Sequence, residues 1–223
     1  MSDIRGVVHN ASAQPRSAKD TYRYAAVTPN GALFSATYLD SLAREGRIFV
    51  SSDADENDVI VGATSFAATT PTLLLEVPNG TVALPLWVML QQAGTVAGGN
   101  ISVAVSFDII SRYTSGGTAE TIRSTRSDHP VTPLCTLYST GGSAIVAPAA
   151  SRAQSLYHQT IMQDVALVAT DIPLPFADEG VWRPPAPIYL TGPASLLVFT
   201  YAATTGPSWL WSIGWAEIPE TEF

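Results

Sequence analysis

The stretch from Thr81 to Tyr113, TVALPLWVMLQQAGTVAGGNISVAVSFDIISRY, constrains the fold of this chain more than any other. Its second half alternates between apolar and polar side chains from Ile101 to Ile109, which is the period of a half-buried β-strand. Its first half, residues 82–90, is apolar on both faces. A strand of that kind needs two covers, a second sheet on one side and a loop or a neighbouring subunit on the other. The stretch therefore predicts two long strands, joined by a Gly-rich loop, in a layered β-structure.

The composition fits one sizeable domain with few charges. Of the 223 residues, 46% are hydrophobic and 13% are charged, against about 25% charged residues in an average globular domain. Lys19 is the single lysine. Two explanations stay open, since either much of the surface contacts partner molecules, or the surface is neutral and rich in small polar residues.

The net charge of −8 argues against a dedicated nucleic-acid-binding protein, because phosphate binding needs clustered Lys and Arg. The lone Cys135 excludes an intramolecular disulfide framework. The opening residues lack the apolar core of a signal peptide, and no uncharged apolar run is long enough to predict a membrane helix. We therefore expect synthesis in a cytoplasm without export, and no membrane association.

The pattern divides the chain into an N-terminal arm and one domain. Residues 1–22 are polar, unpatterned and slightly basic, which predicts an extended arm. Residues 23–223 are predicted to form a single β-sandwich domain. Within them, residues 35–46 are the best helix candidate, because Leu39 and Leu42 share a face and Gly46 suits a C-terminal cap.

Strand patterns dominate the remainder. Candidates lie at residues 46–52, 59–66, 72–77, 131–138, 143–147, 195–203 and 208–218, besides the central two. The sequence Pro78-Asn79-Gly80 is typical of a hairpin turn, residues 155–172 favour a strand over a helix, and five prolines predict a long loop at 173–187. The whole predicts an all-β fold, an antiparallel β-sandwich or jelly roll with one short helix and an N-terminal arm.

No arrangement of residues predicts catalysis. His9, His129 and His158 are isolated, without the close His spacing of a metal-dependent jelly-roll enzyme. There is no G-x-S-x-G nucleophile turn. A Ser–His–Asp triad assembled from distant positions stays open. We expect a protein that is not an enzyme and needs no cofactor.

One acidic loop could bind a metal ion. The segment SSDADENDV places Asp53, Asp55 and Asp58 close together and opens like a calcium-binding EF-hand loop. It then departs from that pattern, because Asp58 stands where glycine is needed and Thr64 where the bidentate glutamate should be. An EF-hand is therefore excluded. A solvated loop is the favoured interpretation, and a looser Ca²⁺ site near these three residues is the alternative.

Large apolar side chains supply the candidate interface or ligand face. Trp209, Trp211 and Trp215 alternate along one face of the strand at 208–218, and Trp87 and Met89 lie on the second face of the strand at 82–90. Tryptophan rings hold sugar rings well, although filling the core of a sandwich is their commoner use.

The chain resembles a virion structural protein with a jelly-roll fold, of the tailed-phage or viral capsid and decoration type. The resemblance lies in the N-terminal arm, in the strands VPNGTVALPLWVML and GGNISVAVSFDIISRY, and in the closing PIYLTGPASLLVFTYAATTGPSWLWSIGWAEIP. It implies a homo-oligomer, with a trimer as the expected state, that contacts other capsid proteins in the virion and has no catalytic residues. The alternative is a carbohydrate- or receptor-binding β-sandwich module, as in a phage tail tip or a lectin.

Overall fold

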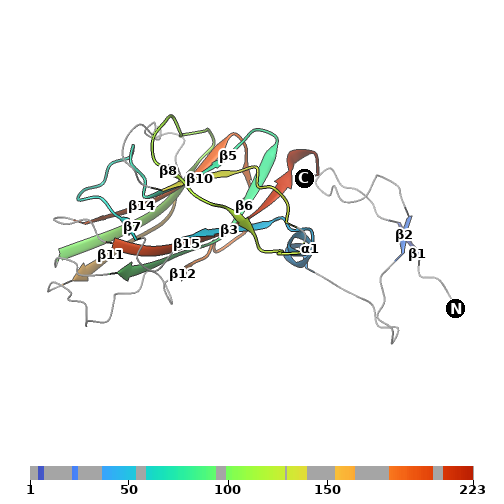
Figure 1. Cartoon of the computed structure of the whole chain (residues 1–223), viewed down its shortest axis with the longest axis horizontal. Coiled ribbons are helices and arrows are strands. Elements are labelled where there is room, and N and C mark those ends of the chain that lie inside the picture. The colour runs from blue at the N-terminus through green and yellow to red at the C-terminus, as the bar shows by residue number, and fades with distance from the viewer. Residues whose placement is uncertain are drawn as a thin grey trace.

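The computed structural model describes residues 5–7, 22–24, 37–53, 59–93, 99–128, 130–139, 154–163, 181–202 and 208–222. Across these residues the chain is mostly β-structure, with two antiparallel sheets packed as a β-sandwich (Figure 1). The predicted all-β sandwich with one short helix is therefore confirmed. No helix in this part of the chain is long and apolar enough to cross a membrane.

The first sheet has six strands in the order β11-β7-β14-β5-β10-β8. Their bounds are Gln154–Gln163 (β11), Gly99–Asp108 (β7), Ala194–Ala202 (β14), Leu73–Val77 (β5), Thr136–Ser139 (β10) and Thr118–Ala119 (β8). The late strand β14 lies between β5 and β7, so Leu197 is opposite both Leu74 and Ser106. Interleaving of early and late strands is the rule in Greek-key and jelly-roll sandwiches.

The second sheet has seven strands. Five follow the order β12-β6-β15-β3-β9, while β13 also pairs with β6 and β4 with β15. Their bounds are Val181–Trp182 (β12), Thr81–Ala93 (β6), Ser208–Pro219 (β15), Ile48–Ser52 (β3), Arg123–Ser124 (β9), Leu190–Thr191 (β13) and Ile60–Val61 (β4). The longest pairing joins β6 to β15 and shifts register between Gly214 and Trp215.

The two long strands predicted from Thr81 to Tyr113 are β6 and β7, and they belong to different sheets. The turn at Pro78-Asn79-Gly80, with Gly80 at φ 80°, likewise joins β5 of one sheet to β6 of the other. The hairpin prediction at this turn is therefore wrong. A turn signal marks a reversal of the chain, and long-range pairing decides whether the next strand joins the same sheet.

The main core fills the space between the sheets. Inward side chains of the six-stranded sheet, such as Leu75, Val105 and Leu196, belong to one buried cluster with side chains of β15. Phe49 of β3 packs on Trp215 with ring centroids 6.2 Å apart. Burial of such large aromatic side chains contributes much of the apolar area removed from water.

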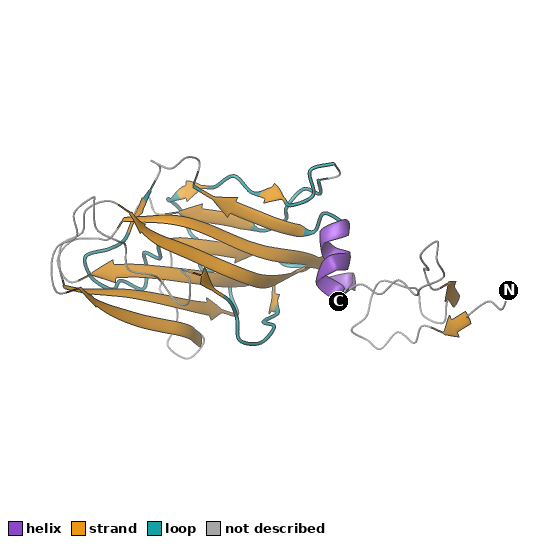
Figure 2. Cartoon of the chain, turned by 90° about the horizontal axis from the view of Figure 1, so that it is seen from below, coloured by secondary structure: helices purple, strands orange, loops and turns teal. Residues whose placement is uncertain are grey.

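The short helix α1 runs over Tyr38–Arg44, inside the predicted 35–46. A capping box starts it, because the Asp40 amide donates to Thr37 Oγ1 at 3.2 Å and the Thr37 amide donates to Asp40 Oδ2 at 3.0 Å. Gly46, at φ 73°, follows its end. The fully buried Leu42 packs on outward side chains of β6 and β15, and α1 lies across one end of these strands (Figure 2). There, the second cover that β6 needs comes from the chain itself.

Several segments that were predicted as strands or loops differ in extent from the observed strands. The 155–172 segment is a strand, β11, as far as Gln163, and the 59–66 candidate is reduced to β4. The Pro-rich stretch contains the short strand β12, so the prediction of a loop throughout is wrong there. The polar segment 114–130 contributes β8 and β9. Residues 143–147 lie outside the described residues.

The described residues of the predicted arm lie in a separate ladder, whose second strand continues past the predicted end of the arm at residue 22. β1 (Arg5–Val7) pairs with β2 (Tyr22–Tyr24), and Figure 1 shows this pair apart from the sandwich. A 3₁₀ turn at Glu220–Glu222 follows β15 at the other end of the chain.

Candidate functional site

The outer face of the seven-stranded sheet is covered by α1 at one end and half-exposed beyond it. Alternation along β6 and β15 places Trp87, Met89 and Leu210 outward and half-buried. Val50 lies opposite Gly214, and Val181 lies opposite Met89, so they extend the same surface. We call these residues, Val50, Trp87, Met89, Val181 and Leu210, the outer apolar strip. Along β12, β6, β15 and β3 no charged side chain projects from this described face.

Trp87 is held against the sheet by a glycine. A Cβ added to Gly214 would lie 2.3 Å from the Trp87 ring carbons Cη2 and Cζ2, so only glycine lets the indole approach the backbone this closely. The indole nitrogen donates to Ser212 Oγ at 3.4 Å. The ring is therefore fixed in place before any partner binds, which lowers the entropy cost of an interface.

The three tryptophans of β15 have a different place from Trp87. Trp209 and Trp215 are fully buried, Trp211 is 2% exposed, and all three belong to the core between the sheets. This corrects the expectation of an interface or ligand face on Trp209, Trp211 and Trp215. Both faces of β15 are apolar, so the pattern alone did not say which face turns inward.

Two buried glutamates fasten loops to the sandwich. Glu217, 3% exposed, accepts hydrogen bonds from the amides of Leu134 (2.7 Å) and Cys135 (3.1 Å), and from Trp215 Nε1 (2.9 Å). A buried carboxylate is stable only when its oxygens are well hydrogen-bonded. Here it fixes the segment that enters β10.

Glu76 does the same on the outer face of the six-stranded sheet. Its Oε1 accepts hydrogen bonds from the amides of Arg112 and Tyr113, both at 2.9 Å, and from Ser195 Oγ at 2.7 Å. The Arg112 guanidinium forms a buried ion pair with Asp108, with Nε 2.9 Å from Oδ2. The loop after β7 is thereby anchored at both backbone and side chain.

Tyr113, at the end of this anchored loop, stacks on Tyr138 of β10. The ring centroids are 3.9 Å apart and the planes differ by 7°. Beside the two rings lies a pocket of about 330 Å³, lined by Glu76, Val77, Pro78, Asn79, Ser111, Tyr113, Thr136, Tyr138 and Pro193. We call it the tyrosine pocket.

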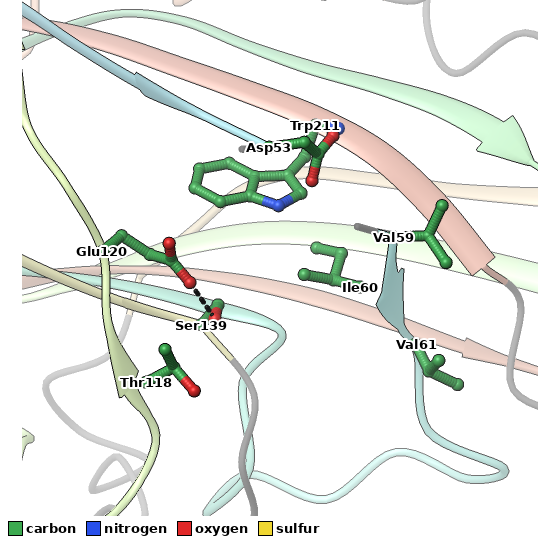
Figure 3. Close-up of a pocket in the computed structure, with 8 residues that line it drawn as sticks. All are labelled: Asp53, Val59, Ile60, Val61, Thr118, Glu120, Ser139 and Trp211. Atoms are coloured by element: carbon green, nitrogen blue, oxygen red, sulfur yellow. Dashed lines mark hydrogen bonds between the residues drawn. The ribbon is translucent and has the colours of Figure 1, made fainter. Parts of the chain in front are cut away.

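A second pocket, of about 270 Å³, opens between the two sheets. It is lined by Asp53, Val59, Ile60, Val61, Thr118, Glu120, Ser139 and Trp211 (Figure 3). Asp53 accepts a hydrogen bond from the Trp211 amide, and Ser139 Oγ donates to Glu120. Both carboxylates therefore already have donors from the chain.

The described residues of this pocket do not form a set of ligands for the calcium ion of the alternative interpretation. Asp53 is in place at the end of β3, whereas Asp55 and Asp58 lie outside the described residues. Among the residues that the structure does describe, no three His, Cys, Asp or Glu side chains come together as a metal site. The favoured interpretation of a solvated loop stays a prediction.

Of the three histidines, only His158 is described. It is exposed, and its Nε2 lies 3.2 Å from the Tyr201 hydroxyl. The buried Ser195 donates to Glu76, and no described histidine contacts it. The described residues thus bring together no nucleophile and base of the Ser–His type.

Comparisons with protein-family models, with curated proteins and with solved structures found no match. The class of protein is therefore defined by the structure itself, as an antiparallel β-sandwich of a seven-stranded and a six-stranded sheet.

The two anchoring glutamates were not predicted from the sequence. Glu76 interrupts the apolar run LLLEV, and Glu217 follows Trp215 in a strand with few other polar residues. A carboxylate in such a run must be exposed or hydrogen-bonded, so its position could have flagged it. Its partners come from loops distant in the sequence and could not have been named.

Proposed function

We propose that this chain is a virion structural protein, a capsid or capsid-decoration subunit that assembles with copies of itself. The observation that carries the proposal is the outer apolar strip, whose four strands carry no outward charge and which holds a fixed tryptophan and a methionine. Arg123 of β9 lies opposite Val50 at its edge. Cores of protein interfaces are depleted in charge and enriched in aromatic residues and methionine. Isolated apolar side chains need no partner, but a continuous strip across four strands indicates one.

A second copy of the chain is the partner that this proposal assigns to the surface. The chain carries a net charge of −8, so two copies repel each other over most of their surfaces. The outer apolar strip is where they can meet without placing like charges together. Closed symmetric assemblies reuse such a patch on every subunit. In this proposal a trimer is the expected state, and residues 1–22 reach onto a neighbouring copy.

The test is the solution mass of the purified protein by light scattering at micromolar concentration. We expect a stable oligomer for the wild type and a folded monomer for Met89→Glu, which places a charge in the strip. The matched control is Ile109→Glu, because Ile109 is 62% exposed in the loop that follows β7 of the other sheet; this variant should remain oligomeric. Circular dichroism confirms that each variant is folded. A monomeric wild type would overturn the proposal.

A further inference from the structure

The tyrosine pocket combines two aromatic rings with uncharged polar groups. Tyr113 and Tyr138 line it together with Ser111 and Thr136, whose side chains carry hydroxyls, and Asn79, whose side chain carries an amide. Rings of this kind bind the C–H faces of other ring compounds, and hydroxyl and amide groups fix their orientation. The pocket lies on the six-stranded sheet, away from the outer apolar strip.

The residues that shape the pocket are held in place before any ligand arrives. Tyr138 belongs to β10, which pairs with β5 on one side and β8 on the other. Tyr113 belongs to a loop, yet its amide donates to Glu76 at 2.9 Å and the preceding Arg112 is locked to Asp108. A buried ion pair of this kind adds little net stability, but it fixes the geometry of the surface loop above it. A binding site requires contact residues that are held in position before the ligand binds.

The charge of the lining selects the class of ligand. No lysine, arginine or histidine lines the pocket, so phosphate, sulfate and carboxylate ligands would lack a counter-ion there. Glu76 is the one ionisable carboxyl group of the lining. It is 8% exposed, and its Oε1 already accepts three hydrogen bonds from the chain, so that oxygen is committed to holding the fold. The lining is suited to a neutral ligand.

The hydroxyl of Tyr138 adds a hydrogen-bond donor to the polar groups of the lining. Burial, followed by the neighbouring Tyr113, raises the pKa of Tyr138. The phenol therefore keeps its proton over a wide range of pH and can both donate and accept. A pocket of about 330 Å³ lies near the lower end of the range for small-molecule sites, which suits one or two rings.

We propose that the tyrosine pocket binds a neutral saccharide, with one sugar ring packed on the tyrosine rings and its hydroxyls bonded to Ser111, Thr136 and Asn79. The chemistry that recognises it is a C–H face beside several neutral donors and acceptors. On a particle surface such a site would recognise a glycan of a host cell. The inference does not depend on self-assembly, because the two surfaces lie on different sheets.

The experiment is saturation-transfer NMR on the full chain with three sets of probes. The first holds the neutral sugars glucose, galactose, mannose and N-acetylglucosamine with their disaccharides, the second sialic acid and glucose 6-phosphate, and the third choline. We expect transfer to at least one neutral sugar and none to the anionic probes or to choline. No transfer to any neutral sugar would overturn the proposal, and so would transfer confined to the charged probes.

Variants then place the binding. Tyr113→Ala should abolish it. Since that variant loses the ring stack and could unfold, the double variant Ser111→Ala with Thr136→Val tests the same pocket with little change in shape. It should bind the responding sugar at least about tenfold more weakly, as expected for lost hydrogen bonds. The control is Ser106→Ala, on the outer face of the same sheet but outside the pocket. Unchanged affinity in the double variant would refute the site.

Discussion

Replacing Glu76 by alanine removes the acceptor that holds two amides of the loop after β7. Its Oε1 receives the amides of Arg112 and Tyr113 and the hydroxyl of Ser195. In the alanine variant the Tyr113 amide loses this acceptor, whereas the Arg112 amide keeps Ser195 Oγ and the Ser195 hydroxyl keeps the Ile110 carbonyl oxygen, both at 2.9 Å. A glutamine at the same place keeps an acceptor oxygen and loses only the negative charge, so the two variants separate the hydrogen bonds from the charge.

The size of the effect follows from the number and kind of these bonds. A hydrogen bond to a charged group contributes about 1.5–3 kcal/mol to stability, so three independent bonds would contribute well above about 4 kcal/mol. Three effects reduce this sum. The Arg112 amide and the Ser195 hydroxyl each keep a second partner. Opening of the loop lets water reach the amides, and burial of the carboxylate was itself unfavourable. We expect Glu76→Ala to lower the free energy of unfolding by about 3 kcal/mol and Glu76→Gln by about 1 kcal/mol.

The assay is urea unfolding followed by tryptophan fluorescence, at one fixed protein concentration because association shifts apparent stability. Limited proteolysis of the folded variants reports whether the loop at residues 109–117 opens locally. The control is Glu120→Ala, which removes a half-buried glutamate bonded to the Ser139 hydroxyl at the edge of the same sheet. A loss below about 1 kcal/mol for Glu76→Ala, equal to that of the control, would refute the view that Glu76 fastens the loop.

Three further predictions concern the other sheet and the core. Trp215→Ala should lower the free energy of unfolding by about 3–5 kcal/mol in the same urea assay, because the ring is fully buried. A loss below about 1 kcal/mol, the size expected for a surface substitution, would mean that neighbouring side chains fill the space left by the ring. Gly214→Ala should displace Trp87, whose ring carbons lie 2.3 Å from the new Cβ, costing about 1–3 kcal/mol and shifting the indole emission to the red; unchanged emission would contradict the contact. Burial, and to a smaller extent the neighbouring Glu217, raises the pKa of Cys135. The thiol of the folded protein should therefore resist a disulfide reagent at neutral pH, and rapid labelling of the native protein would contradict this. The free energy of unfolding should fall once the pH exceeds the ordinary thiol pKa of about 8.5.

The sign of the pH effect on Cys135 follows from the direction of its shift. The folded state favours the neutral thiol, whereas the unfolded chain releases its proton at the ordinary pKa. The stabilisation is therefore complete below that value and is lost as the pH rises toward the higher pKa of the folded state.

The periodic segments were the most predictable part of the fold. The alternation from Ile101 to Phe107 predicted β7 and its inward face, and the Leu39, Leu42 and Gly46 pattern located α1. Ile109, the last residue of the predicted alternation, lies past the end of β7 and is 62% exposed. These signals are local, since strand period and helix capping depend on residues only a few positions apart. The sandwich class followed from the number of such strands and the scarcity of helix.

What the pattern could not supply was the choice between two apolar faces. β15 alternates cleanly, yet nothing local distinguishes Trp209 turned inward from Trp209 turned outward when the facing residues are small or apolar as well. The decision comes from pairing, because the neighbouring strand β6 buries Val88 and Leu90 on the same side. The two-residue strands β8, β9 and β12 escaped for the same reason, since their pairing with longer strands defines them.

The candidate surfaces follow from the uneven way in which this chain covers its two sheets. On the seven-stranded sheet, α1 covers one end and leaves the outer apolar strip at the other, on four strands without an outward charge. On the six-stranded sheet, Glu76 and the Asp108–Arg112 pair hold a loop that shapes a polar, aromatic pocket. If both proposals hold, assembly through the first sheet leaves the second facing outward. The monomeric variant Met89→Glu should then bind a neutral sugar as tightly, site for site, as the assembled protein.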